Sequence, residues 1–221
     1  PYGLQFDPQS LFALCKFVLS IESEGKRITT AEAREVTVTP LPGILQAEYQ
    51  LGDVNVHVEA MPLHPLCDTV NAEGVMLLKV TTDPPCPVHI DCGGMSPMSV
   101  WKRESWLRGK FSGEVPNRSE VSNDLGLISH ESVPYHVALR GVEATPIQES
   151  MTVRDPLVEV VLPGGKGSLI AAFAREEERA TSLAAMDSTA AEEETLDHFN
   201  RLLSQFKIDT PEPAINDAFR T

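Results

Sequence analysis

The residues best suited to chemistry gather in one segment of the chain. Met95 to Phe111 contains both tryptophans, Trp101 and Trp106, with Arg103 between them. An indole ring stacks on the apolar face of a sugar, and a guanidinium group donates hydrogen bonds to hydroxyls. The segment has no strand periodicity. It could therefore line a carbohydrate site or dock onto a neighbouring domain, or its rings could close the edge of the core.

Metal and thiol chemistry has weaker support. His64 with Cys67, and His89 with Cys92, have the spacing of half a metal site. A three-residue step along a strand places two side chains on opposite faces, so His89 and Cys92 cannot share a metal ion. We expect no metal, no cofactor and free, buried cysteines, because a chain with a large core does not need disulfides. A small enzyme that uses Cys67 with His64 is an alternative.

Other catalytic patterns are absent from the sequence. The run Gly164 to Ser168 resembles a phosphate loop only superficially, because its first glycine and its following helix are missing. There is no G-x-S-x-G motif of a serine hydrolase. The carboxylates lie on wet strand faces, as Glu48 and Glu59 do, or in charged runs. We therefore name no catalytic residue.

Composition narrows the class of protein further. Of 221 residues, 42% are hydrophobic, which is enough for a buried core. The chain carries 32 acidic against 18 basic side chains, a net charge of −14, and its scattered Lys and Arg argue against nucleic acid as a partner. No run approaches the ~20 apolar residues of a membrane-spanning helix, so we predict no membrane partner.

Strand patterns dominate the first 175 residues. Leu45 to Leu51 and Val54 to Ala60 alternate between apolar and polar on either side of Gly52-Asp53, which predicts a β-hairpin. We expect a second hairpin from Phe17 to Ile28 and a late hairpin from Leu157 to Phe173. Strands that recur every ~8–12 residues favour a large antiparallel β-sandwich. The predicted fold class is mainly β.

The composition changes after about Ala174. Glycine disappears, charged runs begin, and apolar residues recur at helical spacing through Leu196, Phe199, Leu203 and Phe206. Thr189 and Glu192 are placed like a capping box. We predict a sandwich domain over 1–175 and a helical linker over 176–221. Residues 214–219 have the pattern of the first turns of another helix, so we expect a longer protein.

The whole layout resembles the N-terminal β-sandwich, or supersandwich, of six-hairpin glycosidases and related sugar phosphorylases, whose catalytic domain is an (α/α)6 barrel. The matching features are the Leu45–Met61 hairpin, the Gly74–Val80 strand with the following Pro84 to Ile90, the late hairpin Val158–Phe173, the acidic connecting helix through Phe199 to Leu203, and the peptide Thr210 to Phe219.

This resemblance implies that the catalytic acid and base belong to a barrel beyond Thr221, and no catalytic residue of the family maps onto this sequence. It implies a non-catalytic N-terminal domain of a bacterial-type carbohydrate-active enzyme. The implied partners are the barrel of the same protein and carbohydrate, and in this family the sandwich often takes part in homodimer contacts. The alternative is a self-standing carbohydrate-binding module with Trp101 and Trp106 as its stacking platform.

Overall fold

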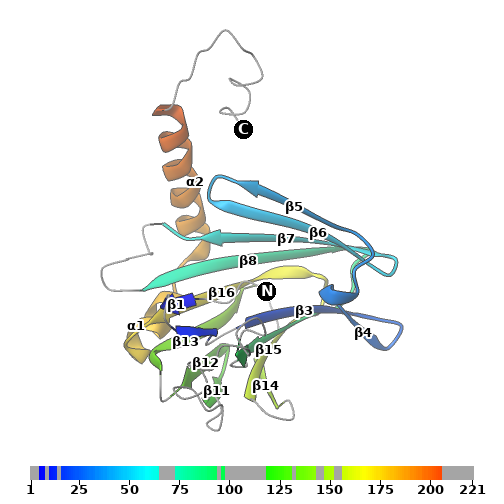
Figure 1. The fold of residues 1–221 in the computed structure, drawn as a ribbon, viewed down its shortest axis with the longest axis horizontal. Helices are drawn as coiled ribbons and strands as arrows, with labels where there is room; N and C mark the ends of the chain where they lie inside the picture. Colours follow the sequence, from blue (N-terminus) through cyan, green and yellow to red (C-terminus); the bar gives the residue numbers. More distant parts are fainter. Residues whose placement is uncertain are drawn as a thin grey trace.

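The computed structural model describes residues 5–7, 10–13, 16–64, 73–93, 96–97, 118–130, 133–142, 147–151 and 156–205. Within these ranges the chain forms three antiparallel sheets, a short 3-10 helix and two α-helices (Figure 1). No helix in these ranges is long and apolar enough to span a membrane. The predicted fold class, a mainly β sandwich followed by a C-terminal helix, is confirmed.

The largest sheet has eight strands. Their order across the sheet is β11 (Arg118–Ser122), β12 (Leu125–His130), β13 (Val133–Val142), β16 (Lys166–Ala174), β8 (Gly74–Asp83), β7 (Val54–Pro62), β6 (Ile44–Leu51) and β5 (Val36–Leu41). Most neighbours in this order are also neighbours along the chain, because short turns join antiparallel strands.

A second sheet has five strands in the order β14 (Ile147–Met151), β15 (Pro156–Leu162), β9 (Val88–Gly93), β3 (Lys16–Ser23) and β4 (Lys26–Thr29). The 3-10 helix Thr30–Glu32 follows β4. A small third sheet contains β1 (Gln5–Asp7), β2 (Ser10–Ala13) and β10 (Ser96–Pro97).

The main core lies between the eight-stranded and five-stranded sheets. On β9, Val88, Ile90 and Cys92 are fully buried, and they pack in one cluster with inward residues of the eight-stranded sheet such as Val56 and Val80. This is the inward face that the alternation along β9 predicts, and it places His89 on the opposite face from Cys92. Neither Cys92 nor Cys86 forms a disulfide; Cys92 is buried, as expected, whereas Cys86 is only half-buried.

A second core lies on the outer face of the eight-stranded sheet. Helix α1 (Glu177–Ala184) and the start of helix α2 (Ser188–Gln205) bury small and aliphatic side chains there. Val75 and Leu77 of β8 face the helices, whereas Leu78 and Val80 belong to or adjoin the inter-sheet core. Strand β8 is therefore buried on both faces from Val75 to Leu78.

The two hairpins predicted early in the chain are present. β6 pairs with β7 across Gly52, whose φ of 63° suits glycine in the turn, and β3 pairs with β4 across Glu24 and Gly25. Their registers match the alternation in the sequence, with Tyr49 opposite Val56.

The prediction of a late hairpin from Leu157 to Phe173 is wrong. β15 pairs with β14 and β9 in the five-stranded sheet, whereas β16 pairs with β13 and β8 in the eight-stranded sheet. The turn at Gly165 therefore carries the chain from one sheet to the other across the core. Two apolar runs around a glycine-rich turn predict two strands, but they do not specify whether the strands bond to each other or face each other.

The predicted capping box of α2 is also wrong. Asp187 precedes the helix, and its Oδ1 accepts hydrogen bonds from the backbone N–H groups of Thr189 at 3.0 Å and Ala190 at 3.4 Å. Glu192 instead forms an ion pair with Lys79 of β8. The helix thus begins one residue before Thr189, and a tertiary contact takes the glutamate that the capping box required.

Candidate functional site

The sequence-predicted sugar-binding residues, Trp101, Arg103 and Trp106, lie outside the described residues, and so does Cys67. The division of the chain at residues 175 and 176 stays a prediction, although the last strand ends at Ala174 and α1 begins at Glu177. Within the described residues, no group of three or more His, Cys, Asp or Glu side chains could hold a metal ion.

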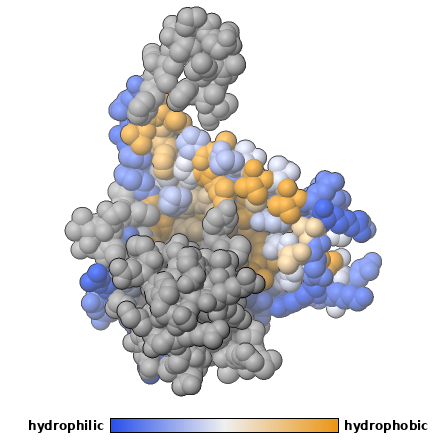
Figure 2. Space-filling view, in the orientation of Figure 1, coloured by the Kyte–Doolittle hydropathy of each residue, from blue (hydrophilic) through white to orange (hydrophobic). Residues whose placement is uncertain are grey.

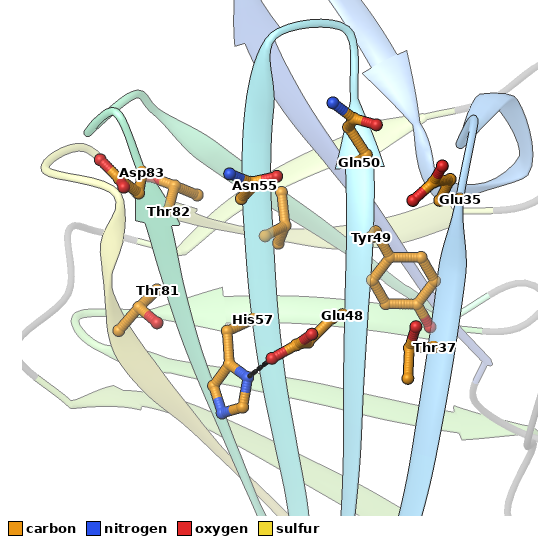
Figure 3. A pocket seen from close by; sticks show the side chains of 11 residues that line it. Glu35, Thr37, Glu48, Tyr49, Gln50, Asn55, His57, Thr81, Thr82 and Asp83 are labelled. Carbon is orange, nitrogen blue, oxygen red and sulfur yellow. Dashed lines mark ion pairs between the residues drawn. The ribbon is translucent and has the colours of Figure 1, made fainter.

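The structure places a polar hollow of about 680 Å³ on the outer face of β5, β6, β7 and β8 (Figure 3). We call this site the polar hollow. Its lining consists of carboxylates, amides, hydroxyls, one imidazole and a small apolar part: Glu35, Thr37, Glu48, Tyr49, Gln50, Asn55, Val56, His57, Thr81, Thr82 and Asp83.

Strand register explains how these side chains come together. Thr37, Glu48, His57 and Thr81 stand opposite one another across the four strands. Successive side chains on a strand point to opposite faces, so the polar half of each alternating strand collects on one surface. In the same way the register aligns Gln50, Asn55 and Asp83 in the next row on that face.

His57 lies at one end of the polar hollow, beside Glu48 (Figure 3). Its Nδ1 lies 3.8 Å from Oε1 of Glu48, and its Nε2 lies 3.4 Å from Oε1 of Glu59, which also accepts a 2.8 Å hydrogen bond from Nε2 of Gln46. The contact between His57 and Glu48 is the dashed line in Figure 3. The separations exceed ordinary hydrogen-bond lengths, so both carboxylates keep acceptor capacity.

A smaller hollow of about 350 Å³ continues toward α2. It shares His57 and Thr81 with the polar hollow and ends at Ser188, Thr189 and Glu192 of the helix. The polar surface therefore extends from the β5 edge of the sheet to the start of α2.

Sequence analysis missed this site. It placed Glu48 and Glu59 on the wet faces of the hairpin, which the structure confirms, but it treated those faces as ordinary solvated surface. The sequence feature that could have revealed the site is that most solvent-facing residues of neighbouring strands are carboxylates, amides, hydroxyls or imidazole. The hairpin register alone puts Glu48 opposite His57 and Gln50 opposite Asn55.

Helix α2 is fastened to the end of the sheet by polar and aromatic contacts. Oγ1 of Thr195 accepts a 2.8 Å hydrogen bond from the N–H of His64, and the His64 ring stacks on His198 at 3.7 Å between centroids. Further along, Phe199 lies against Gly43 in the β5–β6 turn, where a Cβ would come within 2.7 Å of its ring Cζ. His64 therefore serves a packing contact here.

The stacked histidines predict how pH affects the docking of α2. Partial burial, with help from His64 and Arg201, lowers the pKa of His198, and Glu194 opposes this shift. Because the pKa of His198 is lower in the folded state, the unfolded chain binds the proton more readily. The stability of the folded chain is therefore highest above the ordinary histidine pKa of about 6.5, and it decreases as the pH falls below that value. We expect the melting temperature to decrease from pH 7.5 to pH 5.

A His198→Gln variant should show a smaller decrease over the same range, measured by circular dichroism at 222 nm. His57→Gln is the matched control, because that histidine does not contact α2, and this variant should keep the full pH dependence of the parent chain. An unchanged pH dependence in His198→Gln would contradict the assignment.

Among the residues that the structure describes, five large apolar side chains are exposed, and we call them the apolar rim. They are Val36, Val38 and Leu41 of β5 and Leu202 and Leu203 of α2, with exposed fractions of 52%, 50%, 37%, 39% and 40%. Figure 2 shows apolar side chains along the upper part of α2 and across the neighbouring strands. Leu41 is two residues before Gly43, which touches Phe199, so its exposed side chain adjoins the part of α2 that carries the two leucines.

A cluster of charged groups is buried on the outer face of the five-stranded sheet. His89 and Glu159 are each only 8% exposed, and Nδ1 of His89 lies 2.7 Å from Oε1 of Glu159. The Arg27 guanidinium pairs with Glu159 and lies 3.8 Å from Asp91. Burial raises the pKa of Asp91, and Arg27 counteracts this effect. Arg27 is thus the main positive charge that compensates two carboxylates.

Comparison with known proteins places the fold. No family model matches the chain, and no curated protein sequence matches it. Among solved structures, a bacterial glucoamylase complexed with acarbose has a TM-score of 0.53 and 8% identity, over 86% of this chain and 31% of that chain. A putative kojibiose phosphorylase from human microbiome has a TM-score of 0.42 and 8% identity, over 93% and 29%. The chain therefore spans less than a third of each, and its fold is that of one part of the bacterial glucoamylase.

Proposed function

We propose that this chain is the non-catalytic N-terminal β-sandwich domain of a carbohydrate-active enzyme, a glycoside hydrolase or sugar phosphorylase, and that it supports a helical (α/α)6 barrel of the same protein. The fold likeness to about a third of a bacterial glucoamylase supports the assignment to one domain of a larger enzyme. The resemblance described above is the reason for proposing an (α/α)6 barrel as the domain that the sandwich supports.

The observation that carries the proposal is the exposed apolar end of α2. The first half of the helix buries Ala191 and Thr195 on the sheet, whereas Leu202 and Leu203 lie about 40% exposed. Exposing leucine costs free energy of the order of 1–2 kcal/mol relative to burial, so such a pair beside Leu41 is typical of a contact surface. A barrel joined to the sandwich through α2 would cover this part of the apolar rim.

The proposal predicts different effects of one variant in two contexts. In this chain alone, Leu202→Ser with Leu203→Ser should change the free energy of unfolding by less than about 1 kcal/mol, because both side chains are already exposed. In the full protein that the gene encodes, the same pair should lower the melting temperature by several degrees and reduce glycosidic activity. Calorimetry and an activity assay on both proteins measure this difference.

Asn200→Ser with Ser204→Ala is the matched control, because these are exposed polar positions on the same helix. It should have no effect in either context. A gene that ends directly after Thr221 would contradict the proposal, and so would a full protein in which the leucine variant behaves like the control.

A further inference from the structure

The side chains of the polar hollow are rich in unused hydrogen-bonding capacity. Gln50, Asn55 and Thr81 make no side-chain hydrogen bond with another described residue, and the same is true of Thr37 and Asp83. An amide offers two donors and two acceptor lone pairs, and each hydroxyl offers one donor and two lone pairs. The hollow therefore presents donors and acceptors side by side, and a ligand with many hydroxyls can use both.

The charges of the hollow exclude several other ligand classes. Glu35, Glu48 and Asp83 line it, and none of the described lining residues is a lysine or arginine. An anion such as a phosphate would be repelled by the three carboxylates of the lining, and the chain as a whole carries a net charge of −14. No group of three or more potential metal ligands exists within the described ranges. A neutral ligand fits this electrostatic environment best.

The size and shape of the hollow point to a short oligomer. Its volume of about 680 Å³ falls within the range of about 300–1,000 Å³ that is usual for small-molecule sites. The apolar part of its lining is small, because Val56 is only 1% exposed and faces the core, and Tyr49 packs against that core. The smaller hollow beyond His57 extends the same surface toward α2.

From this chemistry we propose that the polar hollow is an accessory binding site for a neutral oligosaccharide, held by the Gln50 and Asn55 amides, the hydroxyls of Thr37 and Thr81, and the carboxylates beside them. The choice of sugar among hydroxyl-rich ligands rests on the proposed function. The residues named here are not part of the Trp101–Trp106 segment, and the role proposed for them is to retain a chain of substrate near the enzyme.

The test is titration of this chain with maltotriose and, separately, with cellotriose, followed by isothermal calorimetry and by amide shifts in a two-dimensional NMR spectrum. We expect saturable binding of one of the two sugars, with shifts at Gln50, Asn55 and Thr81. Asn55→Ala with Gln50→Ala should weaken binding at least about tenfold, because it removes two bidentate partners. These are surface positions, so the melting temperature should change little.

Thr39→Ala is the matched control, since Thr39 is an exposed polar residue on the same strand as Thr37 but does not line the hollow. It should bind like the parent chain. Binding that is lost in Trp101→Ala or Trp106→Ala but kept in the amide variant would overturn the proposal, as would the absence of saturable binding of either sugar, or a preference for sugar phosphates over both. None of these outcomes affects the test with Leu202→Ser and Leu203→Ser. The proposal of a sugar site can therefore be refuted while the proposed domain function still stands.

Discussion

Gly165→Ala is expected to destabilise the chain by about 3–5 kcal/mol. Gly165 has a φ of 69°, which strains any other residue, and a Cβ at this position would come within 2.7 Å of the carbonyl oxygen and 2.8 Å of the amide nitrogen of Cys86. Backbone atoms cannot move aside as a side-chain tip can, so an overpacking cost of about 1–3 kcal/mol adds to the strain. Urea unfolding followed by circular dichroism measures the loss in the free energy of unfolding.

Two other glycines separate the two causes of this effect. Gly164→Ala places its methyl group in open space at a negative φ and should be nearly neutral. Gly25→Ala also meets no atom within 4 Å but has a φ of 71°, so it should show the backbone strain alone, about 1 kcal/mol. A Gly165→Ala variant no less stable than Gly25→Ala would contradict the predicted clash.

The second large effect is expected at Arg27. Arg27→Ala leaves the buried Glu159 and the half-buried Asp91 without their cation, and breaking a buried pair by removing one partner costs about 3–5 kcal/mol. The Arg27 side chain is itself 43% exposed, so solvent screening places the expected loss at the lower end, about 3 kcal/mol. Denaturant unfolding at pH 7 measures it.

The effect of Arg27→Ala should also depend on pH. Burial raises the pKa of Asp91 above its ordinary value, so the charged form destabilises the fold at neutral pH and this cost disappears as the group is protonated on acidification. Without Arg27 that pKa rises further. The difference between variant and parent should therefore shrink from pH 7 toward pH 4. Arg27→Lys keeps the charge and should recover part of the stability. Lys26→Ala removes an exposed neighbouring charge and should have little effect; a loss of stability equal to that in Arg27→Ala would contradict the role assigned to Arg27.

Period-two patterns predicted the hairpins well because each strand has one wet face and one buried face. The strands β6 and β7 are the clearest case: Glu48 and His57 face the solvent, and Val56 faces the core. In a strand with both faces buried, apolar and polar residues do not alternate, so the sequence does not show which side chains face the inter-sheet core. On β16, Leu169, Ile170 and Ala171 are all fully buried, so nothing in that run specified its partners.

The candidate site lay beyond sequence reasoning for a different reason. The shape of a hollow depends on the twist of all four strands and on the side chains at the edges of the sheet. Both are properties of the whole sheet and not of one strand. The register aligns Gln50, Asn55 and Asp83, but Asp83 is 28 positions from Asn55 in the chain. The Trp101 and Trp106 hypothesis used residue type alone, and it stays a prediction.

The shared use of β8, β13 and β16 by two cores has a consequence for how this fold can evolve. These strands contact the opposite sheet on one side and the two helices on the other, with Ala138, Ile170 and Ala172 closely packed beneath α1. A substitution on either side disturbs a packed layer, so these strands have few positions where mutations can accumulate without cost. The strands at the β5 edge have many exposed positions that tolerate mutation, so new binding specificities can arise there.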